Sequence, residues 1–254
     1  MIPNRTSYEG GVWSSIWCEA EKAAAKDPIF GRSLSASIFA HDGLGAAVSH
    51  QIGLRLGKNT GDRHRFERVA NEAFAASPDL VDAAGRDIEW IVLRDPASTG
   101  LLPAFLNFKG YVALQAWRVS NWLWRQNRRD LALLLQSESS DSLQVSIHPS
   151  ASIGTPVLLD HGTGVVIGSF VTIGDEATIQ QNVTVGGKAE SPNRAPRIAR
   201  GVLLSAGATI LGDISIGDFA KIGAGSVVTG DVPSGCTAVG VPARLTNCPQ
   251  PVPA

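Results

Sequence analysis

The stretch that decides the fold runs from residue 198 to residue 228 and reads IARGVLLSAGATILGDISIGDFAKIGAGSVV. An aliphatic residue returns here at every sixth position: Ile198, Leu204, Ile210, Ile216, Ile222 and Val228. A fixed six-residue period is typical of a parallel β-helix, in which each hexad forms one short strand and one corner. A single coil cannot bury its own aliphatic side chains, so the stability of such a solenoid comes from stacking neighbouring coils.

The same period continues toward the N-terminus in two further registers. They contain Ile147, Ile153 and Leu159, and then Ile167, Ile173, Ile179 and Val185. Glycine frequently follows the aliphatic residue, as in Ile153-Gly154 and Ile222-Gly223, and glycine suits corners where φ is positive. The sequence therefore predicts that the solenoid begins near residue 145.

The period slips twice, and each slip predicts a loop that leaves the solenoid. The step from Leu159 to Ile167 is eight residues long and contains Asp160, His161 and Gly162. The step from Val185 to Ile198 is one residue longer than two hexads, and its loop contains Lys188, Glu190, Arg194 and Arg197. Because loops on a rigid scaffold are the usual carriers of function, we expect the chemistry at these two places.

Up to about residue 138 the apolar residues recur at helical spacing, for example at positions 44, 48, 52 and 56. Breaks are predicted at residues 57–61, 77–78 and 96–103. We therefore predict an α+β protein. An α-helical assembly domain spans residues 1–140, a parallel β-helix spans 141–245, and a flexible proline-rich tail spans 246–254.

Composition excludes several classes of function. The 22 basic and 23 acidic residues give no electrostatic footprint for nucleic acid or an anionic membrane. The N-terminus lacks a basic segment followed by an apolar core, and no stretch is apolar for long enough to span a bilayer. Cys18, Cys236 and Cys248 are odd in number and far apart, which favours a reducing compartment over a disulfide framework. A cytoplasmic protein is expected.

Six motifs carry a family resemblance: RDPA (94–97), KGYVALQAWR (109–118), IHPSASIG (147–154), LLDHGTGVVIG (158–168), GAGSVV (223–228) and GVPAR (240–244). Together they resemble serine O-acetyltransferase, the hexapeptide-repeat enzyme that acetylates L-serine for cysteine synthesis. GVPAR marks many hexapeptide acyltransferases, whereas LDHGTG after IHP, joined to RDPA, is much more specific. The resemblance implies a left-handed β-helix and acetyl-CoA as co-substrate. It also implies a homotrimer with active sites between neighbouring chains, and helical halves that join two trimers.

Carried over to this sequence, the resemblance implies a role for each of seven residues. His161 is the general base, and Asp160 and Asp95 hold the α-ammonium of the acceptor, with Asp160 counted among the catalytic residues. Arg194 holds the acceptor's carboxylate, where a planar guanidinium makes a bidentate pair. The groove for coenzyme A is lined by three residues: Gly186, Ala206 and Lys221.

Each role has a plainer alternative. His161 is alternatively a corner residue of the solenoid, and Asp95, which precedes Pro96, is alternatively the end of a helix. Arg194 and Lys221 are alternatively solvated surface charges. No metal is expected, because a metal-assisted β-helix enzyme needs three convergent histidines and the repeat region has only two, at positions 148 and 161.

The sequence departs from the family pattern at three places. Ser146 stands where the family has an aspartate that supports the catalytic histidine, and Ala195 stands where it has a histidine beside Arg194. The chain ends at Ala254, whereas relatives that dock into cysteine synthase end in isoleucine, so we expect no such complex or only a weak one. Ala195 predicts weaker inhibition by cysteine.

These departures leave two alternatives beside transfer of an acetyl group to L-serine. One is a same-fold acyltransferase that acts on another amino alcohol or serine-like acceptor, or on a longer acyl chain. The other is a catalytically weak or silent homologue that serves as a regulatory subunit. The retained Asp95, Asp160 and His161 favour an enzyme, because a silent scaffold needs none of them.

Overall fold

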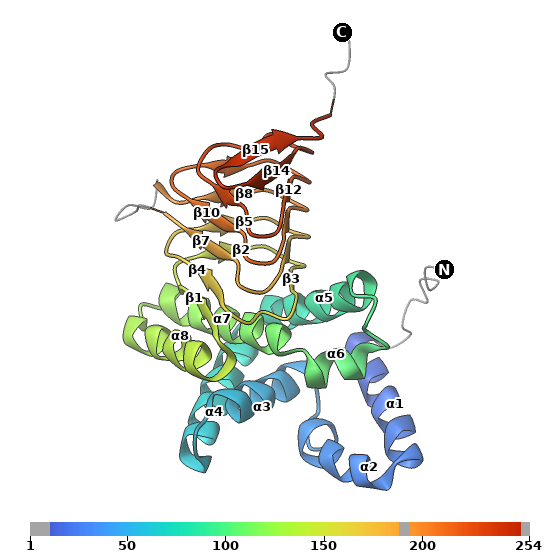
Figure 1. The fold of residues 1–254 in the computed structure, drawn as a ribbon. Helices are drawn as coiled ribbons and strands as arrows, with labels where there is room; N and C mark the ends of the chain where they lie inside the picture. The colour runs from blue at the N-terminus through green and yellow to red at the C-terminus, as the bar shows by residue number, and fades with distance from the viewer. Residues whose placement is uncertain (1–10, 188–193, 250–254) are drawn as a thin grey trace.

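The computed structural model describes residues 11–187 and 194–249. Its N-terminal half is helical and its C-terminal half is a solenoid that stands on the helices (Figure 1). The helices are α1 (Gly11–Lys26), α2 (Pro28–Leu34), a π-helical turn η1 (Ser35–Phe39), α3 (Leu44–Leu56), α4 (Thr60–Ala76), α5 (Pro78–Arg94), α6 (Leu101–Asn107), α7 (Lys109–Arg125) and α8 (Arg129–Leu143). No helix in the described ranges is long and apolar enough to cross a membrane.

The helix boundaries follow local sequence signals. Asp27 caps α2 by accepting hydrogen bonds from the backbone N–H groups of Ile29 and Phe30, and Pro28 occupies the first helical position. Two predicted breaks fall between α3 and α4 and between α4 and α5. The third break is shorter than predicted, because α6 begins at residue 101 and accommodates Pro103 in its first turn, where proline costs no hydrogen bond.

The solenoid is built from three sheets, one on each side of the prism, whose strands pair in parallel except for the antiparallel pair of β14 and β15. Their strand orders are β1-β4-β7-β10-β13, β11-β8-β5-β2 and β15-β14-β12-β9-β6-β3. The strands are β1 (Val145–Ile147), β2 (Ser152–Ile153), β3 (Leu158–Leu159), β4 (Val165–Ile167), β5 (Thr172–Ile173), β6 (Thr178–Ile179), β7 (Thr184–Gly186), β8 (Arg197–Ile198), β9 (Leu203–Leu204), β10 (Thr209–Leu211), β11 (Ser215–Ile216), β12 (Lys221–Ile222), β13 (Val227–Val228), β14 (Thr237–Gly240) and β15 (Ala243–Thr246).

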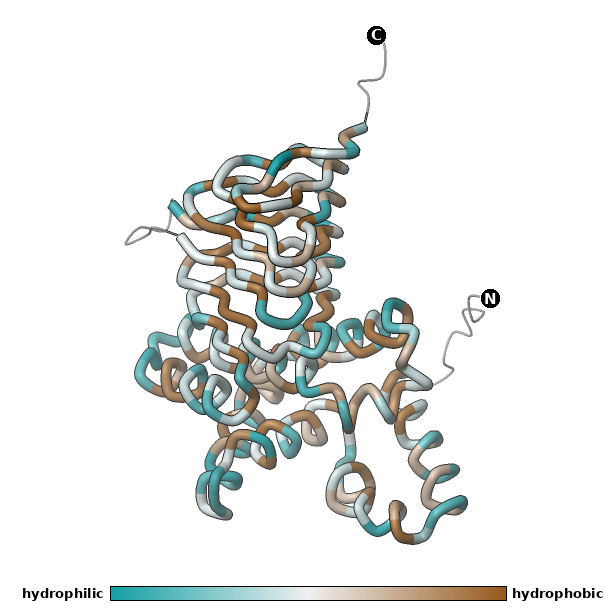
Figure 2. The backbone as a smooth tube through the Cα atoms, viewed as in Figure 1, coloured by the Kyte–Doolittle hydropathy of each residue, from teal (hydrophilic) through white to brown (hydrophobic). Residues whose placement is uncertain are grey.

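The aliphatic residues of the hexads stack in register and are buried, which confirms the predicted architecture. In the first sheet Ile147 pairs with Ile167, and Ile210 pairs with Val228. Hydrophobic segments alternate with polar ones around each coil (Figure 2). The stacked pair Ile147 and Ile167 is twenty residues apart in the sequence, whereas the stacked pair Ile210 and Val228 is eighteen residues apart. The slip after Leu159 therefore adds two residues to one corner of the first coil.

A buried polar cluster joins the helical half to the first coil of the solenoid. Arg118 donates from Nε and Nη2 to Oδ2 of Asp87 at 2.9 and 2.7 Å, and Gln115 donates to the same oxygen at 2.9 Å. The backbone N–H of Val157 donates to the other oxygen at 3.0 Å, and Arg118 also reaches the carbonyl oxygen of Gly154 at 3.0 Å. Burial raises the pKa of Asp87, and these partners act against that rise.

Helix α7 also approaches the solenoid more closely than a side chain would permit. A Cβ on Gly110 would lie 2.1 Å from the carbonyl oxygen of Leu159, so only glycine fits at the second position of this helix. Leu159 directly precedes Asp160 and His161 in the chain. The start of α7 therefore sets the position of the loop that follows β3.

One expectation about the cysteines is wrong. Cys236 and Cys248 form a disulfide, while Cys18 is free and exposed. The two partners are separated by twelve residues, and antiparallel pairing of β14 with β15 brings the chain back so that they meet. The cysteines therefore give no support to a reducing compartment.

Strand β15 ends at Thr246, the first residue of the predicted tail. Residues 250–254, which include the terminal Ala254 on which the prediction about cysteine synthase depends, lie outside the described residues.

Candidate active site

A cleft of about 440 Å³ lies where α5 meets the first coils of the solenoid. Its lining combines the end of α5 with residues of the sheet that contains β3, β6 and β9: Arg94, Asp95, Pro96, Ala97, Leu158, Asp160, His161, Thr178, Gln180 and Leu203. Asp95 follows the last residue of α5, whereas Asp160 and His161 follow β3, and all three were predicted to act on the acceptor. The structure thus brings three of the predicted site residues into one place.

His161 occupies the apex of a tight turn. The backbone N–H of Gly162 donates to the carbonyl oxygen of Asp160 at 2.6 Å, and His161 itself has a φ of 56°. The turn is anchored on both sides, because the backbone N–H of Asp160 donates to the carbonyl oxygen of Ile179 and that of Gly164 donates to the carbonyl oxygen of Gln144. The imidazole therefore projects outward from a fixed backbone and is 74% exposed.

The backbone conformation at His161 is not by itself a mark of function. Phe170, Glu176, Asn182 and Phe219 also have positive φ at solenoid corners. What distinguishes His161 from these corner residues is its surroundings, since it shares the cleft with two carboxylates.

Asp160 is oriented by two neighbours. Its Oδ1 lies 3.6 Å from Nε2 of His161, and its Oδ2 accepts a hydrogen bond of 3.2 Å from the amide of Gln180. The Asp160 side chain is only 21% exposed. A partly buried carboxylate beside an accessible imidazole can orient the ring and stabilise its protonated form.

Asp95 ends α5, as the plainer alternative predicted, and also lines the cleft. Its backbone N–H donates to Ile91, and its Oδ1 accepts from the N–H of Ala97 at 2.8 Å. These contacts fix the turn after the helix and engage one carboxylate oxygen. The other oxygen makes no hydrogen bond within the described residues, so it is available to a cation in the cleft.

The remaining predicted residues lie elsewhere on the solenoid. Lys221 is exposed, and in the sheet register it lies two strands beyond Thr178 of the cleft wall. The backbone N–H of Ala206 donates to the side chain of Gln180 at 3.0 Å, which ties it to the cleft from the next coil. Gly186 ends β7 in a different sheet. Arg194 is exposed and does not line the cleft, and Lys188 and Glu190 lie outside the described residues.

The two substituted positions do not face the cleft of their own chain. The hydroxyl oxygen of Ser146 accepts from Gln136 at 3.2 Å, so its described partner is a helix side chain and not His161. Ala195 is only 2% exposed and packs in the core. His148 hydrogen-bonds Ser150, and burial lowers its pKa. No group of three potential metal ligands occurs in the described part of the chain.

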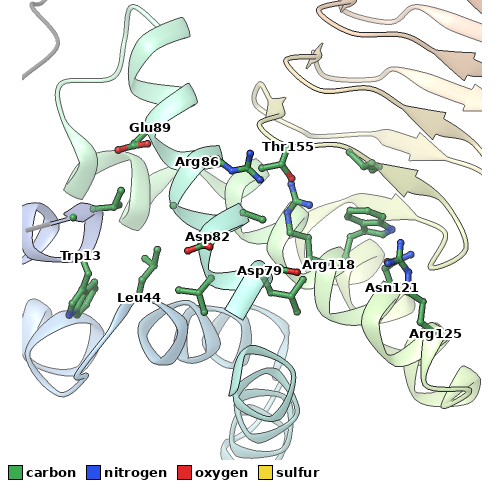
Figure 3. A pocket seen from close by; sticks show the side chains of 18 residues that line it. Trp13, Leu44, Asp79, Asp82, Arg86, Glu89, Arg118, Asn121, Arg125 and Thr155 are labelled. Atoms are coloured by element: carbon green, nitrogen blue, oxygen red, sulfur yellow. The ribbon is translucent and has the colours of Figure 1, made fainter. Parts of the chain in front are cut away.

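A larger hollow of about 910 Å³ lies between α1, α5 and the C-terminal end of α7 (Figure 3). Asp79, Asp82 and Glu89 contribute carboxylates from α5, and Trp13 comes from α1. Its lining contains no histidine, cysteine or serine, and Arg118 is already engaged by Asp87. This larger hollow therefore offers no side chain of the kinds that usually act as a nucleophile or as a histidine base.

Sequence reasoning missed two residues that shape this cleft. Gln180 holds Asp160, but its position in the hexad is an ordinary outward one. Gly110 sets the approach of α7, and the only signal was its place in the KGYVALQAWR motif. Both roles depend on contacts between segments that are distant in sequence.

Known proteins resemble this chain in both of its halves. The family "Serine acetyltransferase, N-terminal" matches residues 12–116, and the six-repeat bacterial transferase hexapeptide family matches residues 195–230. A serine acetyltransferase of Salmonella typhimurium is 43% identical over 94% of this chain and 88% of its own length. A soybean serine acetyltransferase structure complexed with serine is 44% identical, with a TM-score of 0.88 over 92% of this chain and 97% of its own.

A further serine acetyltransferase structure, complexed with CoA, is 39% identical, with a TM-score of 0.89 over 92% of this chain and 98% of its own. The match spans both the helical half and the solenoid, and so confirms the resemblance predicted from the motifs. The chain belongs to the serine acetyltransferase family.

Proposed function

We propose that this protein transfers the acetyl group of acetyl-CoA to the hydroxyl of L-serine, with His161 as the general base. The observation that carries the proposal is the meeting of Asp95, Asp160 and His161 in a single cleft. Relatives with the same fold bind serine and CoA, respectively, in their solved structures, which supports both substrates.

The chemistry assigns one proton to the imidazole. Neutral His161 takes the proton of the serine hydroxyl as that oxygen attacks the thioester carbonyl carbon. The carbon–sulfur bond then breaks, and the imidazolium returns the proton to the departing thiolate. O-acetylserine and free CoA are the products, so no redox step or metal is required.

The two carboxylates supply the binding site for the acceptor's ammonium group. Asp160 and Asp95 face the cleft from the solenoid and from α5, so a cation between them is attracted from both sides. The same Asp160 lies beside His161, which places the bound amino acid next to the base. Proximity of this kind is a large part of catalysis, because it replaces a bimolecular encounter by a positioned one.

A second copy of the chain is expected to complete the site. Arg194, proposed to bind the serine carboxylate, does not line the cleft of its own chain. The sheet that contains β4 and β10 exposes Val166 and Leu211 at 44% and 40%, two apolar side chains that packing in a homotrimer would cover. Ile29, 84% exposed on α2, is a candidate contact where the helical halves join two trimers.

The groove for acetyl-CoA is proposed to continue upward from the cleft along the same sheet. Thr178, Leu203 and Lys221 are in register on β6, β9 and β12, so their outward positions form one column. Adjacent strands lie about 4.8 Å apart, which places Lys221 about 10 Å from the lower end of that column. A lysine at this distance suits a phosphate, with backbone groups near Ala206 as further contacts. Gly186 ends β7 in another sheet, so its proposed contact with the coenzyme requires a second copy of the chain.

A second acceptor is favoured by one observation. Ala195 is buried and uncharged where the family pattern has a histidine, so the carboxylate half of the site has fewer donors than the ammonium half. A serine-like amino alcohol is therefore the alternative acceptor. The same loss predicts weak inhibition by cysteine, whose carboxylate would use the same contacts.

The test is release of free thiol from acetyl-CoA, with L-serine and a panel of amino alcohols, in wild type and His161→Ala. We expect turnover on L-serine that the variant reduces by at least about 100-fold, the range typical of a lost general base. Turnover on an amino alcohol and not on L-serine would identify the amino alcohol as the acceptor. Absence of turnover on every acceptor, or an unaffected variant, would overturn it.

A further inference from the structure

Gln180 connects three successive coils of the solenoid at the wall of the cleft. Its Nε2 lies 3.2 Å from Oδ2 of Asp160 on the coil below, and its Oε1 lies 3.0 Å from the backbone nitrogen of Ala206 on the coil above. The backbone around Gln180 is fixed by the same ladder of hydrogen bonds. Its N–H donates to the carbonyl oxygen of Leu204, and the backbone N–H of Asp160 donates to the carbonyl oxygen of Ile179, the residue before Gln180. Both ends of the amide are therefore held.

The amide can adopt only one orientation in this environment. The backbone nitrogen of Ala206 is a donor and accepts nothing, so it requires the oxygen of the Gln180 amide. The NH₂ group must then face Asp160 and donate to it. A 180° flip would place the amide oxygen against a carboxylate and the NH₂ group against an N–H, which would lose both hydrogen bonds.

We infer that Gln180 is a positioning residue for the reaction, and that it acts by fixing the rotation of the Asp160 carboxylate. The inference rests on the proposed function. The terminal torsion of an aspartate is broad and roughly two-fold, so an unrestrained carboxylate samples many orientations. Gln180 occupies Oδ2, which leaves Oδ1 directed to the side of His161 and free to receive the acceptor's ammonium group.

A neutral donor is suited to this role. A lysine or arginine at position 180 would also hold Oδ2, but its charge would compete with the ammonium group for Asp160. An amide orients the carboxylate and leaves its negative charge intact. Gln180 therefore tunes the affinity for an amino-bearing acceptor through its NH₂ group, while its oxygen contacts only the backbone N–H of Ala206 in the proposed coenzyme groove.

The proposal predicts a selective kinetic defect. Gln180→Leu removes both hydrogen bonds at similar volume, and we expect KM for L-serine to rise about 10- to 100-fold, the loss associated with one hydrogen bond to a charged group. KM for acetyl-CoA should rise by less than KM for L-serine, because within the described residues the side chain of Gln180 contacts the proposed coenzyme groove only through the hydrogen bond from the backbone N–H of Ala206. The matched control is Gln181→Leu, because the adjacent Gln181 side chain makes no hydrogen bond within the described residues.

Gln180→Glu separates positioning from packing. Its carboxylate still accepts from Ala206 but repels Asp160, whereas the protonated acid donates as the native amide does. The ratio of its kcat/KM for L-serine to that of Gln180→Leu should therefore rise as the pH is lowered. A merely structural role would leave this ratio independent of pH.

Three results are decisive. A selective rise in KM for L-serine, together with the pH-dependent rescue, supports the inference. An unchanged Gln180→Leu enzyme, or one in which both KM values rise equally, overturns it while wild-type turnover keeps the proposed function intact. If circular dichroism shows that Gln180→Leu does not fold, kcat/KM of Gln180→Glu is compared with that of wild type across the same pH range. A Gln180→Glu defect that does not diminish at low pH then overturns the inference.

Discussion

Gly110→Ala tests whether helix α7 sets the position of the catalytic turn. The added Cβ would lie 2.1 Å from the carbonyl oxygen of Leu159 and 3.0 Å from both its carbonyl carbon and its Cβ, so the closest clash is with backbone. Since carbon atoms pack at about 3.5–4.0 Å, helix and strand must separate by roughly 1 Å. Leu159 is joined directly to Asp160, so this displacement passes to the cleft.

Two magnitudes follow from that displacement. Overpacking of this kind costs about 1–3 kcal/mol, which lowers the melting temperature of a chain of this size by roughly 2–10 °C. A misplacement of about 1 Å in a catalytic group costs on the order of 100-fold in rate. We therefore expect kcat to fall far more than the modest loss of stability would suggest.

The assay compares Gly110→Ala with Gly85→Ala by thiol release and thermal melting. Gly85 is a buried glycine of α5, and its added Cβ would lie 3.6 Å or more from every neighbour, an ordinary contact distance. Gly85→Ala should keep full activity and gain roughly 0.5–1 kcal/mol from lower backbone entropy in the unfolded chain. Equal behaviour of the two variants would refute the reasoning.

Other parts of the structure give further expected outcomes. Asp87→Asn should lower the free energy of unfolding by about 3–5 kcal/mol, measured by urea denaturation, because it leaves Arg118 charged, buried and unpaired. Burial lowers the pKa of His148 below its ordinary value of 6.5, so the unfolded chain binds a proton at this imidazole more readily than the folded chain does. The free energy of unfolding therefore decreases as the pH falls below 6.5. His148→Asn should flatten the decline in melting temperature between pH 8 and 5.5. Thiol titration of the denatured protein should give one thiol before reduction and three after it, because Cys236 and Cys248 are paired.

The solenoid was predictable because its information is local and repeated. Each hexad independently places one aliphatic residue inward, and positions such as Ile173, Ile198 and Ile216 meet in the sheet as the period requires. The helical half was less fully predictable. Pro103 falls in the first turn of α6 where the sequence suggested a loop, because proline ends a helix only when it falls beyond the first turn.

The candidate site was predictable only in part, for a physical reason. A slip in a regular period identified Asp160 and His161 without any knowledge of their neighbours. The roles of Gln180 and Gly110 depend on which coil or helix lies opposite, and that is set by tertiary packing. The disulfide was missed for the same reason, since antiparallel pairing of β14 and β15 creates its geometry.

The position of the cleft on the first coils follows from how the two halves meet. Of the sheet that lines the cleft, β3 packs against both α5 and α7, and the higher strands lie beyond the helices. Only at this height can a carboxylate from a helix end, Asp95, face one from the solenoid, Asp160. The buried Asp87–Arg118 pair holds the helices at the level of the first coil, because it joins α5 and α7 to the backbone of that coil. A change that loosens this pair should therefore weaken binding of the acceptor's ammonium before it disturbs the solenoid above.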